Sequence, residues 1–144
     1  MTDDEKYMRL ALAEADAAAT EGEVPIGAVV VCDGQVVARA HNRRELDLDP
    51  SAHAEFSAMV EASRVLGRWR LSGCTVKGGA LGPLYDVSHD PRLNHEFEVT
   101  SGVLADEAAS QLRAFFRARR EARKAAKAQA GAEAITDPTE QPAS

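Results

Sequence analysis

The fold is decided by residues 26–40, which read IGAVVVCDGQVVARA. Two runs rich in β-branched residues, Ile26 to Cys32 and Gln35 to Ala40, flank the pair Asp33-Gly34. An Asp-Gly pair between two such runs is typical of the tight turn of a β-hairpin, because both residues tolerate a positive φ. We therefore predict two adjacent antiparallel strands.

A helix is predicted before this hairpin. Thr2 and Glu5 have the spacing of a capping box, and apolar residues recur at helical intervals from Met8 to Ala19. Gly22 follows at a position suited to a left-handed helix end.

A second helix is predicted after the hairpin, beginning near Asp49-Pro50 and ending at Gly67. We expect Phe56 and Val60 to pack it on the sheet, and Trp69 to pack at the edge of the core.

The second half of the chain is less regular. A third strand is predicted to begin after the run 71–76, with Cys74 ahead of it, and is expected to be a stub because the glycine-rich run 77–83 interrupts it almost at once. A loop then leads to a short strand at 98–100 and to a last helix from about Asp106. Residues 129–144 are small, polar and contain proline, which predicts a disordered tail behind one domain at 1–128.

Composition narrows the function classes. The two cysteines, Cys32 and Cys74, form no Cys-x-x-Cys pair, no N-terminal leader is evident, and no apolar run approaches the ~20 residues of a membrane span. We expect a soluble cytoplasmic protein. The net charge is −6, yet residues 113–127 carry seven basic residues against Glu121. Such a basic helix is typical of a segment that contacts phosphate groups. It is equally typical of a solvated helix without a partner.

His53-Ala54-Glu55 is the candidate catalytic feature. A histidine and a carboxylate two residues apart diverge by ~200° around a helix, so they share a site only in its first turn. The pattern is then half of a zinc-hydrolase site. Three residues alone are more often a solvated helix start with a capping carboxylate, so the motif gains weight only from the rest of the chain.

The chain resembles the bacterial tRNA adenosine deaminases of the cytidine and deoxycytidylate deaminase superfamily. The resemblance rests on several blocks in the same order, and it covers all but residues 75–77 and the tail. These blocks are 8–15 (MRLALAEA), 23–31 (EVPIGAVVV), 40–43 (AHNR), 52–55 (AHAE), 82–86 (GPLYD), 90–95 (DPRLNH), 102–107 (GVLADE) and 115–117 (FFR) with Arg119-Arg120.

The resemblance implies a cytidine-deaminase-like three-layer α/β/α fold and a homodimer that acts on the tRNA anticodon loop. Hydrolysis at the wobble position converts adenosine to inosine and releases ammonia. In the family a zinc ion is held by the histidine of His-Ala-Glu and by two cysteines of a Pro-Cys-x-x-Cys segment. The resemblance makes His53 the metal ligand, Glu55 the proton-transferring catalytic residue, Asn42 and Asn94 substrate-binding residues, and His95, Arg117, Arg119 and Arg120 RNA-binding residues.

No Pro-Cys-x-x-Cys occurs in this chain. By the resemblance, about 20–30 residues are missing between Thr75 and Lys77, comprising most of strand 3, helix 3 and strand 4 of the family. One of the three protein zinc ligands remains, whereas a catalytic zinc site needs about three. Cys32, Cys74, His89 and His95 are weak substitutes. We expect an inactive chain whose sheet has unpaired edges and which folds poorly.

Three interpretations remain open. The chain is a tRNA adenosine deaminase with an internal deletion in its gene or sequence, which we favour. Alternatively, it is a non-catalytic RNA-binding or dimer-partner protein on the same fold. A cytidine or free-nucleoside deaminase relative is disfavoured by the segment 90–95 and the basic last helix.

Overall fold

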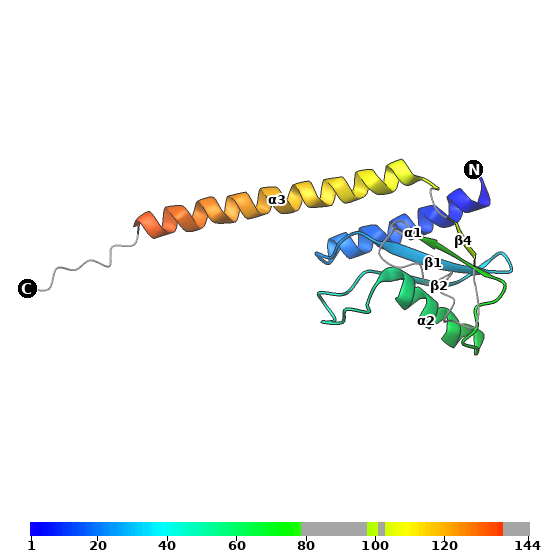
Figure 1. The fold of residues 1–144 in the computed structure, drawn as a ribbon. Coiled ribbons are helices and arrows are strands. Elements are labelled where there is room, and N and C mark those ends of the chain that lie inside the picture. The colour runs from blue at the N-terminus through cyan, green and yellow to red at the C-terminus, as the bar shows by residue number, and fades with distance from the viewer. Residues whose placement is uncertain (79–97, 101–102, 137–144) are drawn as a thin grey trace, which may run out of the picture.

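The structure, a computed structural model, describes residues 1–78, 98–100 and 103–136. Its strands form one sheet in the order β2-β1-β3-β4, with β1 at Gly27–Cys32, β2 at Gln35–His41, β3 at Cys74–Gly78 and β4 at Glu98–Thr100. Helix α1 (Asp3–Thr20) and the start of α3 (Ala105–Thr136) lie over one face, and α2 (Ala54–Leu66) lies over the other (Figure 1). The predicted three-layer α/β/α fold is confirmed.

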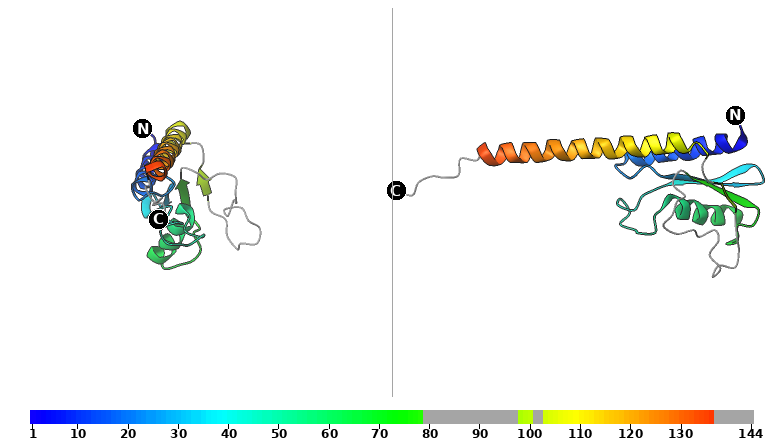
Figure 2. Two further views of the ribbon diagram at one scale, coloured as in Figure 1. Left: turned by 90° about the vertical axis from the view of Figure 1, so that its left-hand side faces the viewer. Right: turned by 45° about the horizontal axis from the view of Figure 1, so that its top comes forward.

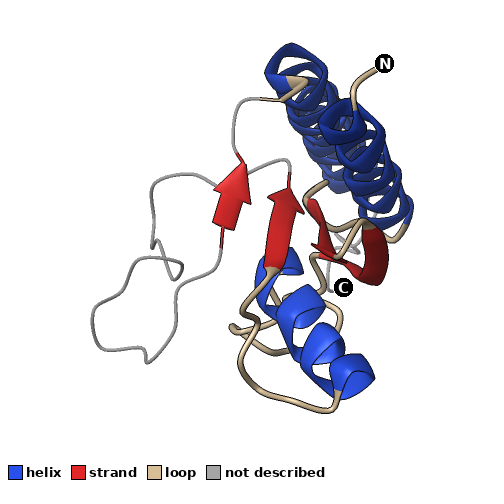
Figure 3. Cartoon of the chain, turned by 90° about the vertical axis from the view of Figure 1, so that its right-hand side faces the viewer, coloured by secondary structure: helices blue, strands red, loops and turns tan. Residues whose placement is uncertain are grey.

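Strand β1 forms the centre of the core because both of its faces are covered. Alternate side chains of a strand point to opposite faces. Ala28, Val30 and Cys32 accordingly pack with α2, while Val29 and Val31 pack with α1 and with Ala108 of α3. Figure 3 shows the helices on the two sides of the sheet. All six residues of β1 are buried, which accounts for the continuous apolar run in the sequence.

The hairpin and the first helix are confirmed. Strands β1 and β2 pair antiparallel from Gly27 opposite His41 to Cys32 opposite Gln35, and Asp33 and Gly34 both have positive φ. Helix α1 begins with the expected capping box, in which the Thr2 hydroxyl accepts from the Glu5 backbone N–H while the Glu5 carboxylate accepts from that of Thr2.

Helix α2 starts later and packs through smaller residues than predicted. Its first residue is Ala54, and Gly67 ends it in the left-handed conformation, so Pro50 lies in the preceding loop. The buried stripe is Ala54, Ala58 and Ala62. Alanines let the helix axis approach the sheet closely, and Met59 and Leu66 pack beside them against the core. Phe56 and Val60 are 36% and 50% exposed and Trp69 is exposed too, so the prediction that these three side chains pack in the core was wrong.

The third strand is not a stub. It has five residues, includes Lys77 and Gly78, and pairs antiparallel with β1 over its whole length. By the resemblance, Lys77 lies on the far side of the missing segment, so β3 is built from both sides of the break. Strand β4 pairs parallel with β3 from Thr75 to Lys77. The edge of β3 that was expected to be unpaired is therefore covered by β4 at these residues.

Helix α3 is longer than the sequence indicates. It continues to Thr136 and projects far beyond the sheet and the other helices (Figure 2). The prediction of a disordered tail from 129 was therefore wrong for residues 129–136, where alanine-rich sequence sustains the helix. Residues 137–144 and most of the glycine-rich run lie outside the described residues. None of the described helices is long and apolar enough to cross a membrane.

Candidate active site

The loop between β2 and α2 sets the position of the His-x-Glu motif. The backbone N–H of Asn42 donates to Ile26 O at 3.0 Å, and that of Arg43 donates to Ala52 O at the same distance. The carboxylate of Glu23, which is 2% exposed, accepts from Leu46 N at 2.7 Å. These bonds fold the loop back on itself and bring His53 to the end of the sheet where Asn42 lies.

His53 is the N-cap residue of α2. Its backbone is extended, with φ −74° and ψ 145°, and its side chain makes no capping hydrogen bond. The imidazole instead lies edge to face with the Phe56 ring, with centroids 6.2 Å apart. Its ring nitrogens therefore make no hydrogen bond that caps the helix.

Glu55 occupies the first turn of α2 and is partly buried. Burial raises the pKa of its carboxyl, and a hydrogen bond from its own backbone N–H and the charges of His53 and Arg44 offset this only in part. A carboxyl with a raised pKa beside cationic groups suits proton transfer. The structure thus places Glu55 and His53 together in the first helical turn, as predicted.

Asn42 is held by a residue that the sequence analysis did not single out. Its side chain is 1% exposed, and Oδ1 accepts from Arg44 N at 3.3 Å and from Arg44 Nε at 3.2 Å. The positive charge of Arg44 also acts on Glu55, where it lowers the pKa of the carboxyl and offsets part of the effect of burial. The signal available in the sequence was the adjacent pair Arg43-Arg44 directly after Asn42.

The basic part of α3 reaches the same loop. Arg119 Nη2 lies 3.5 Å from Oε2 of Glu45, the residue that follows Arg44. The Arg119 guanidinium also lies over the Phe115 ring. Arg117 and Arg120 are exposed. The structure therefore brings this stretch of α3 beside the loop of Asn42. The remaining candidates, Asn94 and His95, lie outside the described residues.

The two cysteines lie at the far end of α2. Cys32 and Cys74 oppose each other on β1 and β3, and Arg68, just beyond the C-terminal end of α2, places Nη2 3.9 Å from the Cys32 sulfur. His53 precedes the first residue of the 13-residue helix, which is about 20 Å long at 1.5 Å per residue, whereas the cysteines lie next to Arg68 beyond its last residue.

The sequence is similar to known deaminases throughout. Residues 1–78 match the family model of the cytidine and deoxycytidylate deaminase zinc-binding region. The tRNA-specific adenosine deaminase of Bacillus subtilis (strain 168) is 41% identical over 156 aligned positions, covering 88% of this chain and 97% of the relative. The chain belongs to the tRNA-specific adenosine deaminase family.

Solved structures agree with this family. A structure from work described as "Biochemical and Structural Studies of A-to-I Editing by tRNA:A34 Deaminases at the Wobble Position of Transfer RNA" superposes with a TM-score of 0.63 at 32% identity, covering 74% of this chain and 99% of its own. A guanine deaminase from Nitrosomonas europaea superposes with a TM-score of 0.63 at 22% identity, covering 77% and 83%, which shows the shared fold.

The alignment with the Bacillus relative also shows that this member of the family is shortened. The alignment has 156 positions although 88% of this 144-residue chain is only about 127 residues. About 29 positions of the relative therefore have no counterpart here. This number fits the internal loss of about 20–30 residues predicted from the resemblance.

The zinc implied by this deaminase family does not fit the residues present. Within 1–78, 98–100 and 103–136, no group of three or more histidine, cysteine or acidic side chains has the geometry of a metal site. Zn–N and Zn–S bonds of about 2.1 and 2.3 Å require ligand atoms within about 4 Å of each other. Cys32 and Cys74 lie far outside that range from His53, so neither replaces the cysteines of the family.

Proposed function

We propose that this chain is a tRNA adenosine deaminase that keeps the nucleoside-facing half of its site and has lost the metal-ligating half. The reaction of the intact site is the hydrolytic conversion of adenosine to inosine at the tRNA wobble position, with release of ammonia. The chain as it stands does not carry out this reaction, because His53 has no second and third zinc ligand among the residues that the structure describes.

One observation carries this proposal. Asn42, Arg44, His53 and Glu55 converge at one end of α2, while the chain's two cysteines lie at the other end. A single imidazole does not retain zinc against water, and histidine and cysteine ligands must come together in the folded state. The half-site thus retains its purine-binding amide and its proton-transferring carboxyl without a group that activates water.

Binding of the tRNA anticodon loop is the part of the function that the remaining residues support. Arg117, Arg119 and Arg120 lie on α3 beside the loop of Asn42, and with Asn94 and His95 we assign them to RNA contact. A wobble adenosine flipped from its stack then meets Asn42 and Glu55. The basic side chains supply phosphate contacts, which position the RNA without reading its sequence.

The proposal is tested by restoring the missing segment. A segment with the Pro-Cys-x-x-Cys motif of the family is inserted between Val76 and Lys77, and inosine is measured in a tRNA with adenosine at the wobble position. The insertion should produce zinc-dependent inosine formation, and the chain without it should match the background of its own Glu55→Gln variant. Zinc-dependent inosine formation by the chain without the insertion would refute the proposal.

A non-catalytic role as a dimer partner is the second candidate, and the outer face of α2 favours it. Phe56 and Val60 lie one turn apart, and burying two such side chains between copies contributes about 1.5–3 kcal/mol each. Sedimentation should then show a homodimer that the double change Phe56→Ser and Val60→Ser dissociates. A monomer at every concentration would exclude this role.

A further inference from the structure

The two cysteines form a cross-strand pair. Cys32 is the last residue of β1 and Cys74 the first of β3, and they are direct partners in the antiparallel register. Directly opposed residues of an antiparallel pair have Cα atoms about 4.5–5.5 Å apart. Disulfides span Cα distances of about 4.4–6.8 Å.

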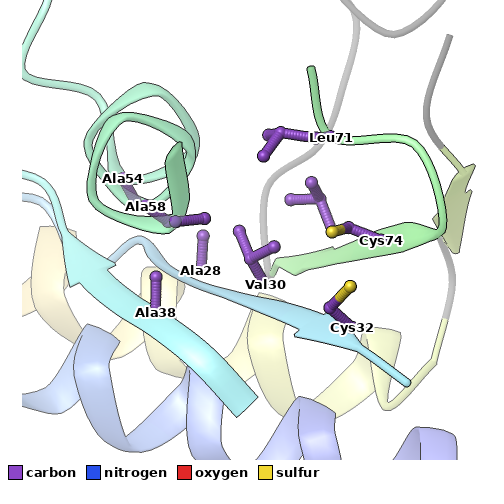
Figure 4. Packing of buried hydrophobic residues seen from close by; sticks show 10 residues of the cluster. Ala28, Val30, Cys32, Ala38, Ala54, Ala58, Leu71 and Cys74 are labelled. Atoms are coloured by element: carbon purple, nitrogen blue, oxygen red, sulfur yellow. The ribbon is translucent and has the colours of Figure 1, made fainter. Parts of the chain in front are cut away.

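Both sulfurs point to the same side of the sheet. The two residues belong to the cluster between the sheet and α2, and Figure 4 shows their sulfur atoms side by side below Leu71. Cys32 and Cys74 are 6% and 3% exposed. The guanidinium of Arg68, which also donates to Ser72 O at 3.1 Å, covers the pair from the loop that follows α2.

We propose that Cys32 and Cys74 are a modification site, at which a small-molecule disulfide such as oxidised glutathione converts the two thiols to an intramolecular disulfide. One thiolate attacks the reagent disulfide, forms a mixed disulfide and releases one reagent thiol. The second thiolate then attacks the protein sulfur of the mixed disulfide and releases the other. The protein loses two electrons and two protons, and the reagent accepts them as two thiols.

The surroundings of the pair set the rate of this exchange. Burial raises the pKa of the Cys74 thiol to about 11, and a hydrogen bond and charge repulsion from Cys32 add to the shift. Since the thiolate is the reacting form, exchange is slow near neutral pH and accelerates with rising pH. The pair lies at the end of β1 and the start of β3, next to the loop 67–73, and the reagent reaches the sulfurs from this side.

The disulfide stabilises the strand that contains the break in the family sequence. It ties β3, which contains that break, to the central strand β1, and it closes a loop of 41 intervening residues. A loop of this length strongly restricts the unfolded chain, so the oxidised protein should melt about 5–15 °C higher than the reduced one.

The test equilibrates the full chain in a series of glutathione redox buffers, with and without denaturing urea, and quenches it by alkylation before intact mass and peptide mapping. We expect a peptide pair joined through Cys32 and Cys74. In urea the chain is flexible, and the effective concentration of one thiol at the other should be near the mM range. In native buffer we expect it to be at least about 100-fold higher. Cys32→Ser and Cys74→Ser are the matched controls, and each should lose the linked peptide and the gain in melting temperature.

Three results would overturn the proposal. One is two alkylated cysteines at every redox potential in native buffer. The second is glutathione attached to separate cysteines, or a disulfide between two copies. The third is an effective concentration that is equal in native buffer and in urea. If the fold brings the two thiols together, the value in native buffer must be the higher one.

Discussion

The imidazole of His41 lies with Nδ1 2.8 Å from Oε2 of Glu14, so the end of β2 is tied to the second half of α1. Its other nitrogen, Nε2, lies 3.0 Å from Oε2 of Glu21, just beyond the last residue of α1. Burial disfavours the charged ring, but the hydrogen bonds and negative charges of the two carboxylates outweigh it, and the pKa of His41 is raised.

This pair predicts that the stability gained from His41 depends on pH. Because the pKa is higher in the folded than in the unfolded state, the contribution is complete below the ordinary value near 6.5 and is lost as pH rises through the folded pKa. The change His41→Asn should lower the free energy of unfolding by about 1–2 kcal/mol near pH 6 and by less near pH 9. Urea unfolding of both proteins at the two pH values measures this. An equal loss at both would contradict the charged state of His41.

Gly27 is predicted to be intolerant of any side chain. A Cβ there would lie 2.1 Å from Ala11 O and 2.7 Å from Ala15 N, both backbone atoms of α1. Gly27→Ala should therefore force α1 away from β1 and cost about 2 kcal/mol or more. Gly131→Ala is the matched control, since nothing lies within 4 Å and alanine favours the helix by about 0.8–1 kcal/mol. Thermal melting of the two variants should move in opposite directions.

The ion pair of Lys77 and Asp4 should stabilise the strand at the break. Lys77 is 6% exposed, and its Nζ lies 2.7 Å from Asp4 Oδ1. Asp4→Asn removes the charge that compensates a buried ammonium, and we expect a loss of about 1–3 kcal/mol. Asp3→Asn removes an equal charge from the same helical turn and controls for the helix dipole. Equal losses in the two variants would show that the pair contributes nothing beyond the dipole.

The assignment of α3 to RNA contact predicts a salt-dependent affinity. Arg117→Gln together with Arg120→Gln should weaken binding of an anticodon stem-loop and reduce the slope of log K against log salt by about 0.7–0.9 per lost phosphate contact. Arg64 is an exposed arginine in the last turn of α2, away from His53. The change Arg64→Gln should leave the affinity and the salt slope unchanged. An equal effect of all three changes would indicate a dependence on net charge alone.

The sequence was a good guide where local chemistry decides structure. Asp33-Gly34 predicted the hairpin, Thr2 and Glu5 predicted the start of α1, and Gly67 predicted the end of α2, because each depends on one or two backbone conformations or hydrogen bonds. The first-turn position of His53 and Glu55 followed from helical geometry for the same reason.

The sequence-based predictions were wrong where contacts between distant parts of the chain decide how a segment packs or how far a strand extends. Phe56 and Val60 are apolar at helical spacing, yet the buried residues of α2 are the alanines at 54, 58 and 62, and both larger side chains are exposed. Lys77 and Gly78 extend β3 because β1 and β4 offer partners for it, which no local pattern reveals. Arg44 contacts Asn42 only because the loop folds back, so its place in the site required the structure.

We infer that His53 and Glu55 form a half-site without its metal partners. Zinc per chain, measured by mass spectrometry after equilibration with zinc and a competing chelator, tests this most directly for the chain and for its His53→Ala variant. We expect well below about 0.1 zinc per chain for both proteins, since one imidazole does not hold the ion. About one zinc per chain that is lost in His53→Ala would contradict it.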